Sequence, residues 1–157
     1  MNFITIGQYF NKLQSVLLLL LIIPLLVFIS LFFFGTQIPQ EPRTEYFFAL
    51  PAIVFCDWLL VVILFNKKIK SVRKEQGLGM KLDQYFRLTV VRFSLISSGS
   101  MIMAVGLYVT RSDIFTGIFI GGLAFSAILW PTARKVSNDL LLKGAEREMV
   151  YFKKDVL

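Results

Sequence analysis

The chain lacks histidine and has one cysteine among its 157 residues. Haem ligated by histidine, zinc sites built on histidine and histidine general bases are therefore excluded. The single thiol, Cys56, has no second cysteine within these residues with which to form a disulfide. Intramembrane proteolysis needs paired aspartates or a serine and histidine dyad, and Asp57 is the only carboxylate within a long apolar run. The sequence therefore predicts that the protein is not an enzyme, with no catalytic, cofactor-binding or metal-binding residues.

Acidic residues are also scarce, with 10 Asp and Glu against 17 Lys and Arg, whereas 56% of all residues are hydrophobic. Most of the apolar residues fall in four long runs, residues 16–34, 46–65, 88–109 and 114–130. Each run is about long enough to cross a hydrocarbon layer about 30 Å thick, and a segment in lipid must satisfy its own backbone. The sequence therefore predicts an all-α integral membrane protein. Its four transmembrane helices form a bundle that is a single domain, residues 1–157, with an amphipathic cytoplasmic tail, residues 131–157.

Positive charge is unevenly divided between the two sides that this topology defines. One side holds the residues Lys12, Lys67, Lys68, Lys70, Arg73, Lys74, Lys81, Arg87, Arg134, Lys135, Lys143, Arg147, Lys153 and Lys154. The opposite side holds Arg43 and Arg111, and Arg92 lies within the third run. The positive-inside rule therefore places both termini in the cytoplasm. We interpret the basic residues as a topology signal that also attracts anionic headgroups, by about 1 kcal/mol per charge, and not as a nucleic-acid surface.

Asp57 is the most costly residue in the apolar runs, because a charged aspartate at a helix centre is disfavoured by about 2.5 to 3.5 kcal/mol. It should face the bundle and either have a partner or be protonated. Counting from the cytoplasmic ends of the runs places Asp57 about 13 Å deep and Arg92 about 9 Å deep, a difference that an arginine side chain spans. We therefore predict an intramembrane ion pair between the second and third helices, which either fixes their register or contributes to transport.

Small residues are concentrated in the third and fourth runs, where they allow helix backbones to approach closely. We expect the third helix to occupy the centre of the bundle, and the short turn at residues 111–113 predicts an antiparallel hairpin with Ser112 or Asp113 as a helix cap. The predicted helix-packing residues are Ser94, Ser98, Gly99, Gly106, Gly117, Gly121, Gly122 and Ser126. This pattern marks helix contact without deciding whether the partner is another helix of the chain, a second copy or another protein.

The segments that flank the runs are amphipathic. Residues 1–15 are expected to form a short helix in the membrane interface, and Gly77 and Gly79 are expected to break the extended second helix. In the tail we predict a helix over residues 132–143, a break at Gly144, and then either a helical turn on the bilayer or a strand against a partner.

The end of the chain, Trp130-Pro131 followed by NDLLLKGAERE at residues 138–148, resembles the tails of small uncharacterised four-span bacterial membrane proteins, particularly those of Bacteroidota. The resemblance implies a multi-pass protein of the bacterial inner (plasma) membrane, and it implies no particular activity. We predict a non-catalytic accessory, assembly or scaffold subunit of a larger membrane complex. The alternative is a small transporter or channel, as a single copy or a homo-oligomer, with a polar path near Asp57 and Arg92. A third hypothesis is a regulator that acts on lipid through the basic middle loop.

Overall fold

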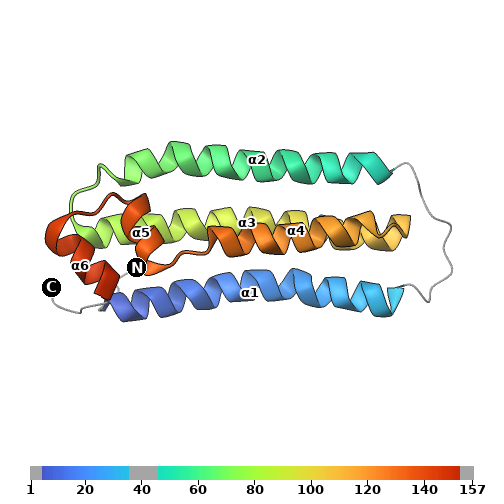
Figure 1. Cartoon of the computed structure of the whole chain (residues 1–157), viewed down its shortest axis with the longest axis horizontal. Helices are drawn as coiled ribbons and strands as arrows, with labels where there is room; N and C mark the ends of the chain where they lie inside the picture. Colours follow the sequence, from blue (N-terminus) through green and yellow to red (C-terminus); the bar gives the residue numbers. More distant parts are fainter. Residues whose placement is uncertain (1–4, 36–45, 153–157) are drawn as a thin grey trace.

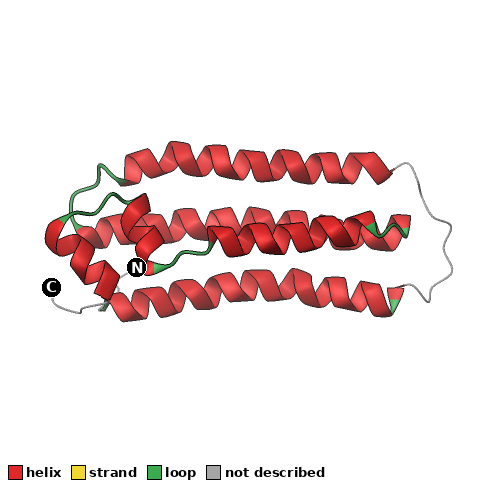
Figure 2. Cartoon of the chain, viewed as in Figure 1, coloured by secondary structure: helices red, strands yellow, loops and turns green. Residues whose placement is uncertain are grey.

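The helices follow the apolar runs and extend beyond them at one end. A computed structural model of the chain describes residues 5–35 and 46–152, and within these ranges it contains six helices and no strand (Figure 2). The helices are α1 (Ile6–Phe33), α2 (Tyr46–Val72), α3 (Leu78–Thr110), α4 (Ile114–Leu129), α5 (Ala133–Asp139) and α6 (Gly144–Phe152). The predicted all-α class is confirmed.

The third helix is the centre of the molecule. α3 packs against α1, α2 and α4, and in Figure 1 α1 and α2 lie on opposite sides of the α3 and α4 pair. α3 also has the largest number of buried positions, which recur along its whole length and on more than one face. The predicted central position of this helix is confirmed, and its small and hydroxyl residues therefore lie among the other three long helices.

Three helices, α1, α2 and α3, are long and apolar enough to cross a membrane. α4 alone has 16 residues, and it makes a fourth candidate span when it is joined to α5 across a bend of 74°. The bend follows from Pro131, because Trp130 before it adopts an extended conformation with ψ 129°, as residues before proline commonly do. The side chain of Lys135 then reaches back, and its Nζ donates to the carbonyl of Ile128 at 2.6 Å near the end of α4.

The turn between α3 and α4 forms the predicted antiparallel hairpin. Arg111 ends α3 in the left-handed conformation with φ 57°, and its N–H donates to Leu107 O at 2.9 Å. Asp113 occupies the N-cap position of α4, but its side chain makes no capping hydrogen bond. The Ser112 carbonyl instead accepts from the Phe115 N–H at 3.2 Å, so the turn is closed by backbone groups.

Two helices start earlier than their apolar runs. α1 begins at Ile6, where Thr5 accepts a hydrogen bond from the Gln8 N–H at 3.1 Å, so residues 6–15 are part of the long helix and not a separate interfacial one. Residues 1–4 of that predicted interfacial segment lie outside the described residues. α3 begins at Leu78, directly after Gly77 with φ 91°, a conformation that glycine adopts without strain. Gly77 therefore separates α2 from α3, whereas Gly79, the second predicted break, lies inside α3.

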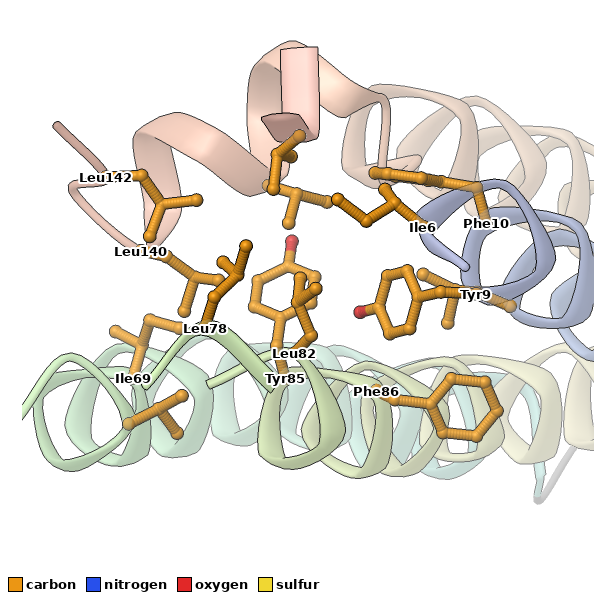
Figure 3. Packing of buried hydrophobic residues seen from close by; sticks show 14 of the residues in the cluster. Ile6, Tyr9, Phe10, Ile69, Leu78, Leu82, Tyr85, Phe86, Leu140 and Leu142 are labelled. Atoms are coloured by element: carbon orange, nitrogen blue, oxygen red, sulfur yellow. The ribbon is translucent and has the colours of Figure 1, made fainter. Parts of the chain in front are cut away.

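The added turns enclose an apolar cluster at the end of the bundle where α5 and α6 lie (Figure 3). Side chains of α1, α2 and α3 form its base, and the tail covers it with Val136, Leu140, Leu142 and Val150, all of which are buried. The second part of the tail is the helix α6 and not a strand. Val150 belongs to the segment after Gly144 that is expected on the bilayer, yet it is buried within the protein together with the other three side chains, because the ends of α1, α2 and α3 offer them an apolar surface. The remainder of the predicted tail, residues 153–157, lies outside the described residues.

Candidate functional site

The two charged residues of the predicted ion pair lie at different levels of the bundle. Asp57 is level with Gly99, since a Cβ built on Gly99 would be 3.6 Å from Asp57 Oδ2. Arg92 is level with Phe65, since its guanidinium carbon is 4.1 Å from the centroid of that ring. Gly99 and Arg92 are about two helical turns, or about 10 Å, apart along α3. The structure therefore does not bring Asp57 and Arg92 together, and neither belongs to an ion pair within the described residues.

Arg92 is held by aromatic stacking and lines a groove between α2 and α3. Only 7% of its surface is exposed, and its Nε has no hydrogen-bond partner in the part of the chain that the structure describes. The guanidinium over the Phe65 ring is a cation–π contact, which becomes stronger as water is excluded. The groove has a volume of about 440 Å³, and Lys68 and Arg87 line it together with Arg92.

Trp58 of α2 inserts between glycines of α3 and α4. A Cβ on Gly99 would lie 3.0 Å from Trp58 Nε1, and a Cβ on Gly122 would lie 2.9 Å from ring carbon Cζ2. The indole also stacks on Phe125 of α4, with the ring centroids 5.7 Å apart. Gly106 plays a similar part in the hairpin, where the Phe115 ring fills the space that a Cβ on Gly106 would need. These three glycines therefore pack within the chain.

The other predicted glycine face is open. Gly117 and Gly121 are exposed, and a Cβ on either would meet nothing within 4 Å. Both line a groove of about 520 Å³ between α2 and α4, whose other lining residues include Phe55 and Ala124. The glycine pair with the spacing Gly-x-x-x-Gly is thus not used by any described helix of this chain.

Of the predicted packing serines, one is buried within the bundle and two are exposed, as was found for the glycines. Ser126 is buried and its Oγ donates to the Gly122 carbonyl at 2.9 Å, within its own helix. Ser94 and Ser98 are exposed, and Ser98 Oγ donates to the Leu95 carbonyl at 2.7 Å, also within its own helix. Ser94 and Ser98 therefore make no hydrogen bond between the described helices of this chain.

A hydrogen bond between two of the long helices, α1 and α3, was not predicted. Ser97 Oγ of α3 donates to the backbone carbonyl of Leu20 in α1 at 2.7 Å. The sequence feature that could have indicated this bond is Pro24 of α1. Proline has no N–H, so the carbonyl of Leu20, four residues earlier, has no backbone donor within the helix. A proline inside a membrane-spanning helix therefore marks a carbonyl for which a neighbouring hydroxyl is a suitable donor.

The tail is attached to the bundle through Asp139, the last residue of α5. Its carboxylate accepts from Tyr85 Oη at 2.9 Å, and its backbone carbonyl accepts from Arg73 Nε at 2.7 Å. A second link joins Lys81 Nζ to Glu146 Oε2 at 3.0 Å. Arg73 directly follows α2, and the other two bundle residues lie in the first turns of α3, so the tail links the end of α2 to the beginning of α3.

Over residues 5–35 and 46–152 the protein is all-helical, with three, or up to four, candidate membrane-spanning helices. Comparison with protein-family models, with curated proteins and with solved structures finds no match.

Proposed function

We propose that this protein is a non-catalytic subunit that packs against a larger membrane complex as an accessory, assembly or scaffold component. The open glycine groove between α2 and α4 is the observation that carries the proposal. Gly117 and Gly121 place backbone, and not side chains, on an exposed helix face. Aromatic side chains of α2 and α4, those of Phe55 and Phe125, stand beside them.

Such a face suits a partner helix better than lipid. Association of helices in a membrane is driven by close packing and by hydrogen bonds, since lipid tails are as apolar as leucine. A helix that approaches Gly117 and Gly121 gains van der Waals contact along the backbone of α4, whereas flexible acyl chains fill such a surface less completely. The other glycines with close neighbours leave no room for a partner helix, because Phe115 packs against Gly106 of α3 and Trp58 packs against Gly122 of α4.

In the proposed topology α1, α2, α3 and α4 each cross the bacterial inner membrane, and both termini lie in the cytoplasm. The distribution of the basic residues supports this orientation, because most of them lie in two stretches that this topology places in the cytoplasm or at its border, residues 66–87 and residues 131–157. α4 would span about 24 Å at 1.5 Å per residue, which requires some thinning of the bilayer or the help of a partner.

Purification of the tagged protein from its native membrane in a mild detergent tests the proposal, with native mass and co-purifying proteins measured together. We expect a foreign subunit in fixed stoichiometry. In Ala124→Leu a bulky side chain enters the groove, and the partner should be lost. The matched control is Ala127→Leu, an equal change at an exposed position of the same helix outside the groove, which should keep the partner. A lone monomer, or equal behaviour of the two variants, would contradict the proposal.

Transport by a homo-oligomer is the second candidate, and the position of Asp57 favours it. This carboxylate is only half-buried within α2, and it has no ion-pair partner in the described part of the chain. A second copy that covered it would place a titratable group inside an assembly. The test is flux in proteoliposomes: transport predicts that Asp57→Asn abolishes flux while the oligomer stays intact, whereas an accessory subunit shows no flux in either form.

A further inference from the structure

The groove between α2 and α3 combines an apolar wall with a positively charged mouth. Val61 and Leu64 of α2 face Val91 and Leu95 of α3 along its length. Residues 61, 64 and 68 of α2 follow one another at the helical spacing that keeps them on one face, so Lys68 stands about one turn beyond Leu64 toward the loop. The groove therefore changes from apolar to charged along the helix axis.

Three cations meet at the charged end. Lys68 and Arg87 stand at the mouth, where both are exposed, and Arg92 lies deeper in the wall. Arg87 Nε donates to Asp83 Oδ2 at 3.1 Å, an exposed pair of the kind that contributes little. No described carboxylate pairs with Lys68 or Arg92, so the three side chains together carry an excess of positive charge.

Arg92 places a positive charge without an ion-pair partner among the described residues in the wall of this end of the groove. It is one of the most deeply buried charged side chains, with 7% of its surface exposed, yet its Nε has no hydrogen-bond partner among the residues described. On the tail side, Asp139 accepts a hydrogen bond from Tyr85 Oη at 2.9 Å and forms no ion pair with Arg92. A buried guanidinium that has no ion-pair partner among the described residues is costly, and an anion in the groove would offset the cost of its charge.

We propose that the groove between α2 and α3 binds one anionic phospholipid. Its phosphate is held between Lys68, Arg87 and Arg92, and an acyl chain lies along the apolar wall formed by Leu64, Val91 and their neighbours. Arginine recognises phosphate oxygens through several N–H donors in a fixed plane, whereas lysine acts as a point charge. The apolar wall commits the site to a lipid, because free phosphate would leave it empty. The proposal needs the helices to lie in a membrane, and it does not depend on the accessory role.

Native mass spectrometry of the purified protein tests the site, with phosphatidylglycerol and phosphatidylcholine of identical chains offered in one detergent. We expect one phosphatidylglycerol to be retained in preference to phosphatidylcholine. Lys68→Gln should lower the affinity for phosphatidylglycerol about fivefold, the effect of one charge near a phosphate. The matched control is Lys67→Gln, which removes the same charge from the next residue of α2 but outside the groove, and the affinity should be unchanged.

A second pair of variants keeps the charges and fills the apolar end. Val91→Trp places a large side chain in the groove, whereas Val105→Trp makes the same change at another exposed position of α3. Only the first should reduce retention of phosphatidylglycerol. The proposal is overturned by equal retention of the two lipids, or by equal effects of Lys67→Gln and Lys68→Gln. It is also overturned if inorganic phosphate, added to the lipid-free protein, raises the melting temperature as much as phosphatidylglycerol does.

Discussion

Ser97 donates a hydrogen bond from its Oγ to the backbone carbonyl of Leu20 at 2.7 Å, which joins α3 to α1. The carbonyl lacks an N–H within its own helix because the residue four positions on is Pro24. In a membrane no water replaces the missing donor, so the hydroxyl of the neighbouring helix takes its place. The proline and the serine therefore form one structural unit, although they lie in different helices.

Replacing Ser97 by Ala should destabilise the folded protein by about 0.6 to 1.7 kcal/mol, the range of hydrogen bonds between membrane helices. In a Pro24→Ala background the cost should fall close to zero, because the introduced alanine would supply the N–H that the Leu20 carbonyl lacks. Unfolding by a denaturing detergent, followed by circular dichroism, measures both values. The matched control is Ser98→Ala, which removes an exposed hydroxyl bonded within its own helix. An equal cost of Ser97→Ala in both backgrounds would contradict the coupling.

The two glycine faces should respond differently to alanine. Gly106→Ala places a methyl group where the Phe115 ring lies, so we expect a loss of about 1 to 3 kcal/mol from overpacking. Gly121→Ala meets open space and replaces a poor helix former by a good one, so it should stabilise the isolated protein by up to about 1 kcal/mol. Thermal unfolding of the purified protein in one detergent compares them. Similar effects of the two changes would mean that the faces are packed alike.

Because Asp57 and Arg92 lie apart, we expect the effects of replacing each of them on the free energy of unfolding to be additive. The unfolding free energies of Asp57→Asn, Arg92→Leu and the double variant should give a coupling energy below about 0.5 kcal/mol, as for sites about 10 Å apart without shared partners. A rescue of Asp57→Asn by Arg92→Leu would instead show a direct pair. The double-mutant cycle is measured by the same detergent unfolding, and Phe65→Leu is a positive control, since Phe65 stacks with Arg92 and should couple to it.

The long helices were predictable because their signal is local. An apolar run in lipid has to be helical, and a turn as short as residues 111–113 has to join antiparallel neighbours. The central position of α3 also followed from its own small and hydroxyl residues. These features depend on the composition of a single segment and not on the register between segments.

The relative level of residues on neighbouring helices, and the side of the helix that packs inward, were not predictable from the composition of single segments. The depths of Asp57 and Arg92 were counted from the ends of apolar runs, but α2 and α3 continue past those ends into the apolar cluster under the tail. The true level of each residue is set by packing, with Asp57 beside Gly99. Likewise, Gly117 and Gly122 belong to similar motifs, but Gly122 faces Trp58 of α2 and Ser100 of α3, whereas Gly117 faces no described residue.

The tail is held in place by Tyr85 and Lys81 of α3 and by Arg73, which directly follows α2. Tyr85→Phe keeps the buried ring but removes the hydroxyl that donates to Asp139 at 2.9 Å, a hydrogen bond to a charged group. Such bonds contribute about 1.5 to 3 kcal/mol, so α5 should open about tenfold or more often while α1, α2 and α3 stay folded. Hydrogen exchange at the α5 amides of Val136 and Leu140 measures this opening. Tyr151→Phe, on the exposed face of α6, is the control and should leave exchange unchanged. Faster exchange throughout the bundle in Tyr85→Phe would show that the tail and the long helices unfold as one unit, and that Asp139 stabilises the whole protein.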